Sequence, residues 1–77
     1  MTRTDIAAEL RIISGSGTVK VGHVCTFVGD KDRYRVKRKF LDGLENINGR
    51  YLVTDVAKRI KAYADEESKK RRGQYEK

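Results

Sequence analysis

The chain has 77 residues, of which 18 are lysine or arginine and 11 are aspartate or glutamate, so its formal net charge at pH 7 is +7. A chain of this length predicts one small domain, with too little buried volume for a deep active-site cleft, and no catalytic constellation is present. The basic excess favours a polyanionic partner, which is DNA, RNA or an anionic membrane.

Cysteine content and hydropathy exclude several classes of protein. The single cysteine, Cys25, excludes an internal disulfide and a cysteine-rich zinc site. No apolar run approaches the roughly 18 residues of a membrane span, and residues 1–10 lack the apolar run of a signal peptide. We therefore expect a cytoplasmic, monomeric protein that is not an enzyme. We expect it to bind no metal, cofactor or small-molecule substrate and to associate with no membrane.

The first predicted helix carries an apolar stripe at i, i+4 and i+7, made by Ile6, Leu10 and Ile13. Thr2 or Thr4 can cap this helix, and Asp5 lies in its first turn, where the helix dipole favours a carboxylate. The segment 14–17, Ser-Gly-Ser-Gly, predicts a loop that ends the helix. It lacks the longer glycine-rich pattern of a phosphate-binding loop.

Two further helices are predicted on either side of Gly29, a residue that can take positive φ and turn the chain. The helix before it has apolar residues at helical spacing, namely Val21, Val24, Cys25 and Val28. The helix after it turns Val36 and Phe40 inward, with Leu41 and Leu44 closing the core, and ends at Asp42–Gly43.

A β-hairpin is predicted across residues 44–53, because Asn48-Gly49 between apolar runs matches a type I′ turn. Thr54 is then expected to cap a fourth helix with an apolar stripe made by Val56, Ala57, Ile60, Tyr63 and Ala64. Residues 65–77 form a charged helical extension of the 1–64 domain. In it, residues 65–67 are expected to pair with Lys69, Lys70 and Arg71 before the helix frays towards Gly73 into a basic tail.

The most unbalanced segment is 31–39, which holds six basic residues against one acidic residue. A run of charge is usually a solvated helix face, but solvated faces mix the two signs. A one-sided basic helix gains affinity for nucleic acid from the counterions that it releases from phosphates. We therefore expect this helix to lie against nucleic acid.

The order helix, glycine turn, basic helix, hairpin, helix predicts a mainly α fold with a small β-hairpin, a winged helix-turn-helix. Over residues 18–62 the chain resembles the MerR-like winged helix-turn-helix domains, especially the small excisionase-type proteins of phages and conjugative elements. The resemblance rests on Cys25 four positions before the turn glycine, on a hairpin that ends in an aromatic residue, Tyr51, and on the Asp55-Val56 opening of the next helix. It departs from the family in the longer, polar turn 30–32, and it lacks the long dimerisation helix and effector domain of full regulators.

The resemblance implies sequence-specific binding to duplex DNA, cooperative on adjacent sites, either as a DNA-bending factor for an integrase or recombinase or as a transcriptional regulator of a mobile element. In the major groove, arginine suits guanine, so Arg35 and Arg38 are the expected base readers. Phosphate anchoring and wing contacts are expected from the remaining candidates, which are Lys31, Arg33, Tyr34, Lys37, Lys39 and Arg50.

Several residues have simpler explanations. Cys25 is expected to be a small core residue, and His23 a surface or phosphate-contacting residue rather than a general base. Phe40 and Tyr51 are expected in the core, which leaves Tyr34 as the aromatic residue at the interface. The alternative functions are a module for RNA or single-stranded nucleic acid, which usually exposes several aromatic residues on a sheet, and a basic adaptor that binds an acidic protein.

Overall fold

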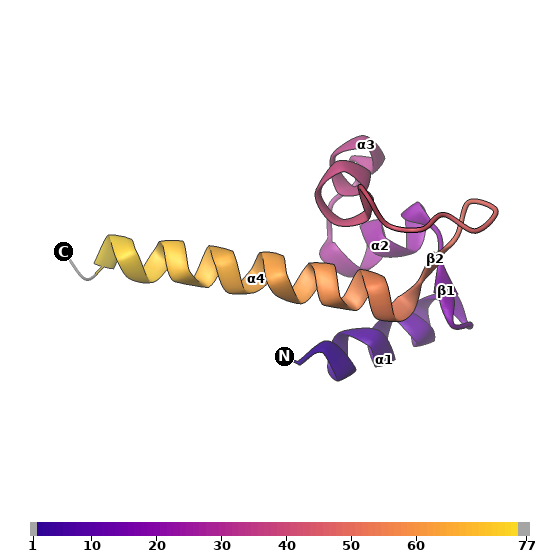
Figure 1. Ribbon diagram of the computed structural model, residues 1–77, viewed down its shortest axis with the longest axis horizontal. Helices are drawn as coiled ribbons and strands as arrows, with labels where there is room; N and C mark the ends of the chain where they lie inside the picture. Colours follow the sequence, from indigo (N-terminus) through magenta and orange to yellow (C-terminus); the bar gives the residue numbers. More distant parts are fainter. Residues whose placement is uncertain (1, 76–77) are drawn as a thin grey trace.

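The computed structural model describes residues 2–75, with side chains for residues 2–68. Within these residues, four helices accompany a two-stranded antiparallel sheet at one end of the molecule, which confirms the mainly helical prediction (Figure 1). The elements are α1 (Arg3–Ser14), β1 (Thr18–Val19), α2 (Val21–Val28), α3 (Arg33–Val36) with the π-helical turn η1 (Lys37–Leu41), β2 (Tyr51–Leu52) and α4 (Val53–Tyr75).

Helix α1 begins where the sequence predicts, because Thr2 and Asp5 form a capping box. The Thr2 hydroxyl accepts the Asp5 N–H (3.2 Å), and the Asp5 carboxylate accepts the Thr2 N–H (3.0 Å). At the other end Gly15 takes φ +73° and its N–H donates to the Arg11 carbonyl (2.7 Å). Both ends are thus set by local hydrogen bonds.

The sheet differs from the prediction. The turn at Asn48-Gly49 is present, with φ +53° and +80°, and Ile47 and Arg50 exchange both backbone hydrogen bonds (2.8 and 3.0 Å). The rest of the predicted hairpin is wrong, since β2 pairs with β1, Val19 opposite Tyr51. The reason is burial: Tyr51 and Val19 are both in the core, whereas the residues that precede Ile47 are the exposed, polar Glu45 and Asn46.

The basic helix is α-helical only at its start and widens into the π turn η1, which the sequence did not predict. In a continuous α-helix, Leu41 would lie roughly 140° around the axis from Val36, at about 100° per residue. A π turn closes on the fifth residue and returns Leu41 to the side of Val36. Val36, Phe40 and Leu41 are all buried as a result, as predicted.

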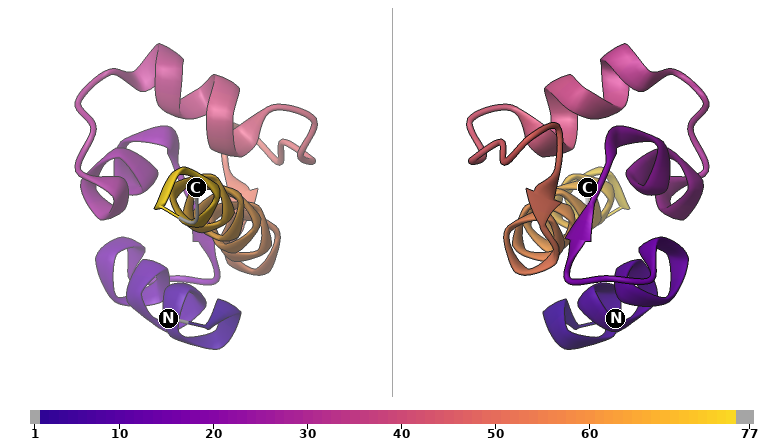
Figure 2. Two further views of the ribbon diagram at one scale, coloured as in Figure 1. Left: turned by 90° about the vertical axis from the view of Figure 1, so that its left-hand side faces the viewer. Right: turned by 90° about the vertical axis from the view of Figure 1, so that its right-hand side faces the viewer.

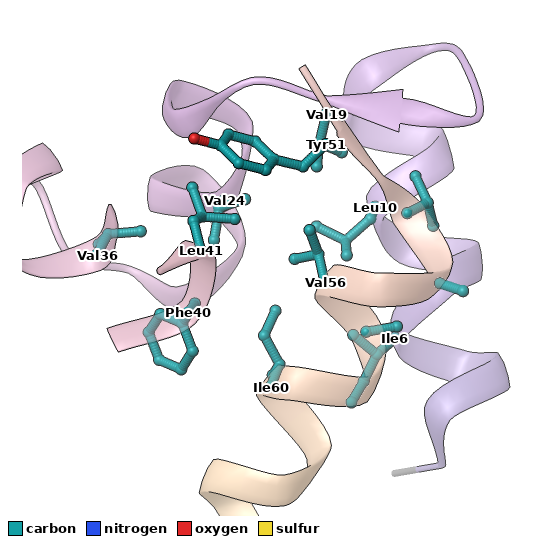
Figure 3. Packing of buried hydrophobic residues seen from close by; sticks show 13 residues of the cluster. Ile6, Leu10, Val19, Val24, Val36, Phe40, Leu41, Tyr51, Val56 and Ile60 are labelled. Carbon is teal, nitrogen blue, oxygen red and sulfur yellow. The ribbon is translucent and has the colours of Figure 1, made fainter. Parts of the chain in front are cut away.

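Helix α4 crosses the centre of the molecule, with α1 on one side and α3/η1 on the other (Figures 1 and 2). Its apolar stripe meets α1, α2, η1 and the sheet in a single cluster (Figure 3). The buried members are Ile6, Ala7, Leu10, Val19, Val24, Val36, Phe40, Leu41, Tyr51, Val53, Val56, Ala57 and Ile60. Ile13, Leu44 and Tyr63 are half-buried, and Ala64 is exposed, so the predicted stripe ends at Tyr63.

The start of α4 corrects another expectation. The helix begins at Val53, directly from β2, so Thr54 lies inside its first turn and is not the N-cap. The Val53 N–H donates to the Gly17 carbonyl (3.0 Å), so the segment just before β1 satisfies this backbone donor.

The far end of α4 continues through Gly73, where fraying was expected, to Tyr75, and projects beyond the rest of the fold (Figure 1). The predicted ion pairs of Lys69, Lys70 and Arg71 lie outside the described side chains. Within the described part, Lys61 pairs with Asp65 (3.0 Å). No helix among the described residues has the length and apolar character needed to cross a membrane.

Candidate nucleic-acid interface

The connection between α2 and α3 is a polar turn held by its own side chains. Gly29, at φ +75°, ends α2 with its N–H donating to the Cys25 carbonyl (2.9 Å). Asp30 then accepts the Asp32 N–H (3.0 Å), and Asp32 caps α3 by accepting the Arg35 N–H (3.1 Å). The polar turn 30–32 is therefore held by its own hydrogen bonds, and these fix the start of α3.

Helix α3/η1 turns its apolar residues inward and presents cations on its other sides. Six of the eight predicted site residues lie in this helix, and a seventh, Lys31, lies in the turn before it; all seven are exposed. We call them the basic face: Lys31, Arg33, Tyr34, Arg35, Lys37, Arg38 and Lys39. In Figure 2 the helix that carries six of them lies along the outer edge of the molecule, on the side away from α1.

Arg35 is held by a fork of hydrogen bonds to Asp30. Its Nε donates to Oδ2 (2.9 Å) and its Nη2 donates to Oδ1 (3.2 Å). The pKa of Asp30 lies below its usual value because the carboxylate accepts the Asp32 N–H and the Arg35 guanidinium donors. The same pair raises the pKa of Arg35. The predicted base reader is therefore a positioned side chain.

Two other cations of the basic face contact tyrosines. The Arg38 guanidinium lies 5.8 Å from the ring centroid of Tyr34, one helical turn earlier. Lys39 leans the other way, onto α4, where its Nζ donates to the Tyr63 hydroxyl (3.3 Å) and lies 5.3 Å from the ring centroid. Tyr63 in turn packs edge-to-face on Phe40, with centroids 5.1 Å apart. Lys39 thus joins the basic helix to α4.

Arg33 lies against the start of α2. A Cβ at Gly22 would lie 3.5 Å from its Nη2, an ordinary van der Waals distance, so the guanidinium lies directly over this part of α2. The two residues line a shallow hollow with Lys20, His23 and Gly49. His23, expected to be a surface or phosphate-contacting residue, is half-buried, and its Nδ1 accepts the Lys20 N–H at the start of α2 (3.0 Å).

The eighth predicted residue, Arg50, lies outside the segment 31–39, directly after the Asn48-Gly49 turn. It is half-buried, and its Nη1 donates to the Thr18 hydroxyl (3.4 Å), so the side chain crosses the sheet to β1. The turn next to it is braced by Asn46, whose side chain accepts the Gly49 N–H (2.7 Å) and donates to the Tyr51 hydroxyl (3.3 Å). A groove lies between the exposed side of the basic helix, the segment that follows it and Tyr51; it is lined by Tyr34, Lys37, Arg38, Leu41, Asp42, Gly43, Leu44 and Tyr51.

Phe40 and Tyr51 are in the core, as predicted, and the free thiol Cys25 is half-buried against it. Tyr34 is exposed, as the interface assignment requires. Among the described residues, no three His, Cys, Asp or Glu side chains gather as a metal site would need.

Sequence reasoning missed Asp30 and Lys20. The Asp30–Arg35 spacing of five residues belongs to no helical pairing rule, because Asp30 sits in the turn before the helix. Lys20 gives no signal because it is isolated in sequence, and it joins the site only where the start of α2 meets Arg33.

A comparison of the chain with protein-family models, curated proteins and solved structures finds no match.

Proposed function

We propose that this chain is a winged helix-turn-helix protein that binds duplex DNA with α3/η1 in the major groove. One observation carries the proposal: a single helix, fixed through Val36, Phe40 and Leu41, and the turn before it expose all of the basic face. An α-helix fits the major groove, where each base pair presents its own pattern of donors and acceptors.

Within this proposal the cations divide into two roles. Arg35 and Arg38 contact base edges, because a guanidinium can donate two parallel bonds to guanine. Lys31, Lys37 and Lys39 bind phosphates and set the register of the helix on the duplex. The loop around Asn48-Gly49 acts as the wing, and Arg50 beside it contacts the adjacent phosphates or minor groove.

The cellular role that we propose is that of a small mobile-element protein, monomeric in solution and cooperative on adjacent sites. It is either an excisionase-like architectural factor that works with an integrase or recombinase, or a transcriptional regulator. The resemblance over residues 18–62 supports this part of the proposal. If an integrase gene adjoins the gene for this protein, the excision role is favoured.

The alternative of single-stranded nucleic acid or RNA needs exposed aromatic platforms. Among the described aromatic residues, Tyr51 and Phe40 are only 3 % and 7 % exposed, whereas Tyr34 is 75 % exposed. One exposed tyrosine beside six cations fits a duplex contact better than a stacking surface. An adaptor for an acidic protein would use the same charge without a base preference.

Salt dependence of binding tests the proposal. If about five phosphates are neutralised, log K for a duplex falls with log salt with a slope of about −4.5, from about −0.9 per phosphate. Lys37→Ala should make the slope shallower by about 1. Lys58→Ala, which removes the same charge from an exposed position on α4, should leave it unchanged. Equal or tighter binding to a single strand of the same length contradicts the proposal.

A further inference from the structure

Arg35 donates to Asp30 through only one edge of its guanidinium group. A guanidinium has five N–H donors, one on Nε and two on each terminal nitrogen. Asp30 takes the Nε–H and one Nη2–H, at 2.9 and 3.2 Å. Both donors of Nη1 and one donor of Nη2 remain, and the parallel pair made by one Nη1–H and the free Nη2–H forms the terminal edge of the side chain.

The environment of the pair leaves that edge accessible. The Arg35 side chain is 52 % exposed, whereas that of Asp30 is 28 % exposed and is held in the turn by the Asp32 N–H. Because Asp30 is fixed by the backbone, it fixes the plane of the guanidinium in turn. The result is an arginine whose orientation is set before any ligand arrives.

We infer that Asp30 is a positioning residue that aims the terminal edge of Arg35 at O6 and N7 of a guanine in the major groove. This rests on the proposed function and adds to it the residue that orients the base reader. Two parallel donors match guanine O6 and N7. Ordering the side chain in advance lowers the conformational cost of binding.

A different role for the same pair is a brake, in which Asp30 occupies Arg35 and keeps it from phosphates. The two roles predict opposite results. A brake predicts that removal of the Asp30 charge raises affinity for every duplex. A positioning residue predicts that its removal lowers the preference for the selected base, whatever happens to non-specific binding.

Asp30→Asn is the test variant, because the amide keeps Oδ1 for the Asp32 N–H and removes the oxygen that accepts from Nε. Asp32→Asn is the matched control: it adds the same unit of charge in the same turn, preserves the cap of α3 and leaves the Arg35 guanidinium bound to Asp30. A cooperative thermal unfolding transition in both variants checks that the fold is retained.

The probes are a duplex selected by the parent protein from a random library and a shuffled duplex of equal length. We expect Asp30→Asn to lower the ratio of specific to non-specific affinity about tenfold, within the range that one arginine–guanine pair supplies. Asp32→Asn should leave the ratio unchanged. An unchanged ratio in Asp30→Asn, or an equal fall in Asp32→Asn, overturns the inference while the proposed function stands.

Replacing guanines of the selected duplex one at a time by 7-deazaguanine, which lacks N7, identifies the base. The parent should lose affinity strongly at one guanine, and Arg35→Ala should be insensitive at that position because alanine has no donor for N7. Undiminished sensitivity in Arg35→Ala overturns the inference. A parent protein that binds no duplex, or selects no sequence, overturns the proposed function and the inference with it.

Discussion

At the scale of single residues, the side chains of the basic face are distinguished by their partners inside the protein. Arg35 is bound to Asp30, Arg38 lies over Tyr34, and Lys39 lies on Tyr63. The sequence predicted which residues would be exposed because the apolar positions fix the helix face. It could not predict the partner of Arg35, which sits in a turn, or that of Lys39, which is 24 residues away.

The Asp30–Arg35 pair should make stability depend on pH only in acid. The pKa of Asp30 is lowered in the folded protein, chiefly by the Asp32 N–H and then by Arg35. A carboxyl with a lowered pKa stabilises the fold above its unfolded pKa, near 3.8, and this contribution is lost as the pH falls through the folded value. We therefore expect Asp30→Asn to melt below the parent at neutral pH, and the two melting curves to converge well below pH 4.

Thermal unfolding as a function of pH measures this convergence. The parent and Asp30→Asn should keep a constant difference in melting temperature between about pH 6 and 8, since Asp30 stays ionised there. A difference that changes within this neutral range would show that another group controls the pair.

At the scale of elements, periodicity predicted the helices and failed where the backbone pairs over long range. Helices α1, α2 and α4 follow from their apolar spacing and from Thr2, Gly15 and Gly29. Pairing of β2 with β1 was missed because two residues, Thr18 and Val19, give no strand pattern, and the local turn signal favoured a hairpin instead. The π turn was missed because its cause is the shape of the core, which must accept both Phe40 and Leu41.

The turn at Asn48-Gly49 gives a direct test of the wing. Gly49 has φ +80° with open space around it, so Gly49→Val is strained by its backbone alone. We expect it to lower the free energy of unfolding by about 1–3 kcal/mol and to weaken DNA binding. Arg50→Ala should keep the fold and weaken binding by about one phosphate contact.

Gly17→Val is the matched control for Gly49→Val, because Gly17 also has open space around it and its φ lies outside the left-handed region. Denaturant unfolding and DNA titration separate the two effects. If Arg50→Ala binds as tightly as the parent at low salt, the wing does not touch the duplex, and the tail at residues 69–72 becomes the candidate for the second contact.

Because of the π turn, we expect Leu41 to contribute strongly to the free energy of unfolding. This side chain is 2 % exposed only because the wider turn brings it beside Val36, so Leu41→Ala leaves a cavity under the basic face. We expect a loss of about 2–5 kcal/mol in the free energy of unfolding. Leu44→Ala, at a half-buried position just after the helix, should cost clearly less in the same chemical denaturation experiment. Equal losses would mean that η1 does not carry Leu41 into the core.

At the scale of the whole molecule, the helix of the basic face and helix α1 lie on opposite sides of one core. The structure extends 46 × 25 × 20 Å, with its length set by α4. Helix α3/η1 lies on one side of α4 and α1 lies on the other (Figure 2). Charge composition predicted a polyanionic partner, but only the fold separates the basic face from the cations of α1, such as Arg3 and Arg11.

That separation allows one measurement to test the central claim, that the basic face is the DNA-binding surface. The protein labelled with ¹⁵N is titrated with a short duplex, and the backbone amide signals are followed residue by residue. The account predicts the largest shifts at residues 31–39, smaller shifts at 47–50, and the smallest in α1. Largest shifts in α1, with residues 31–39 unmoved, would contradict it.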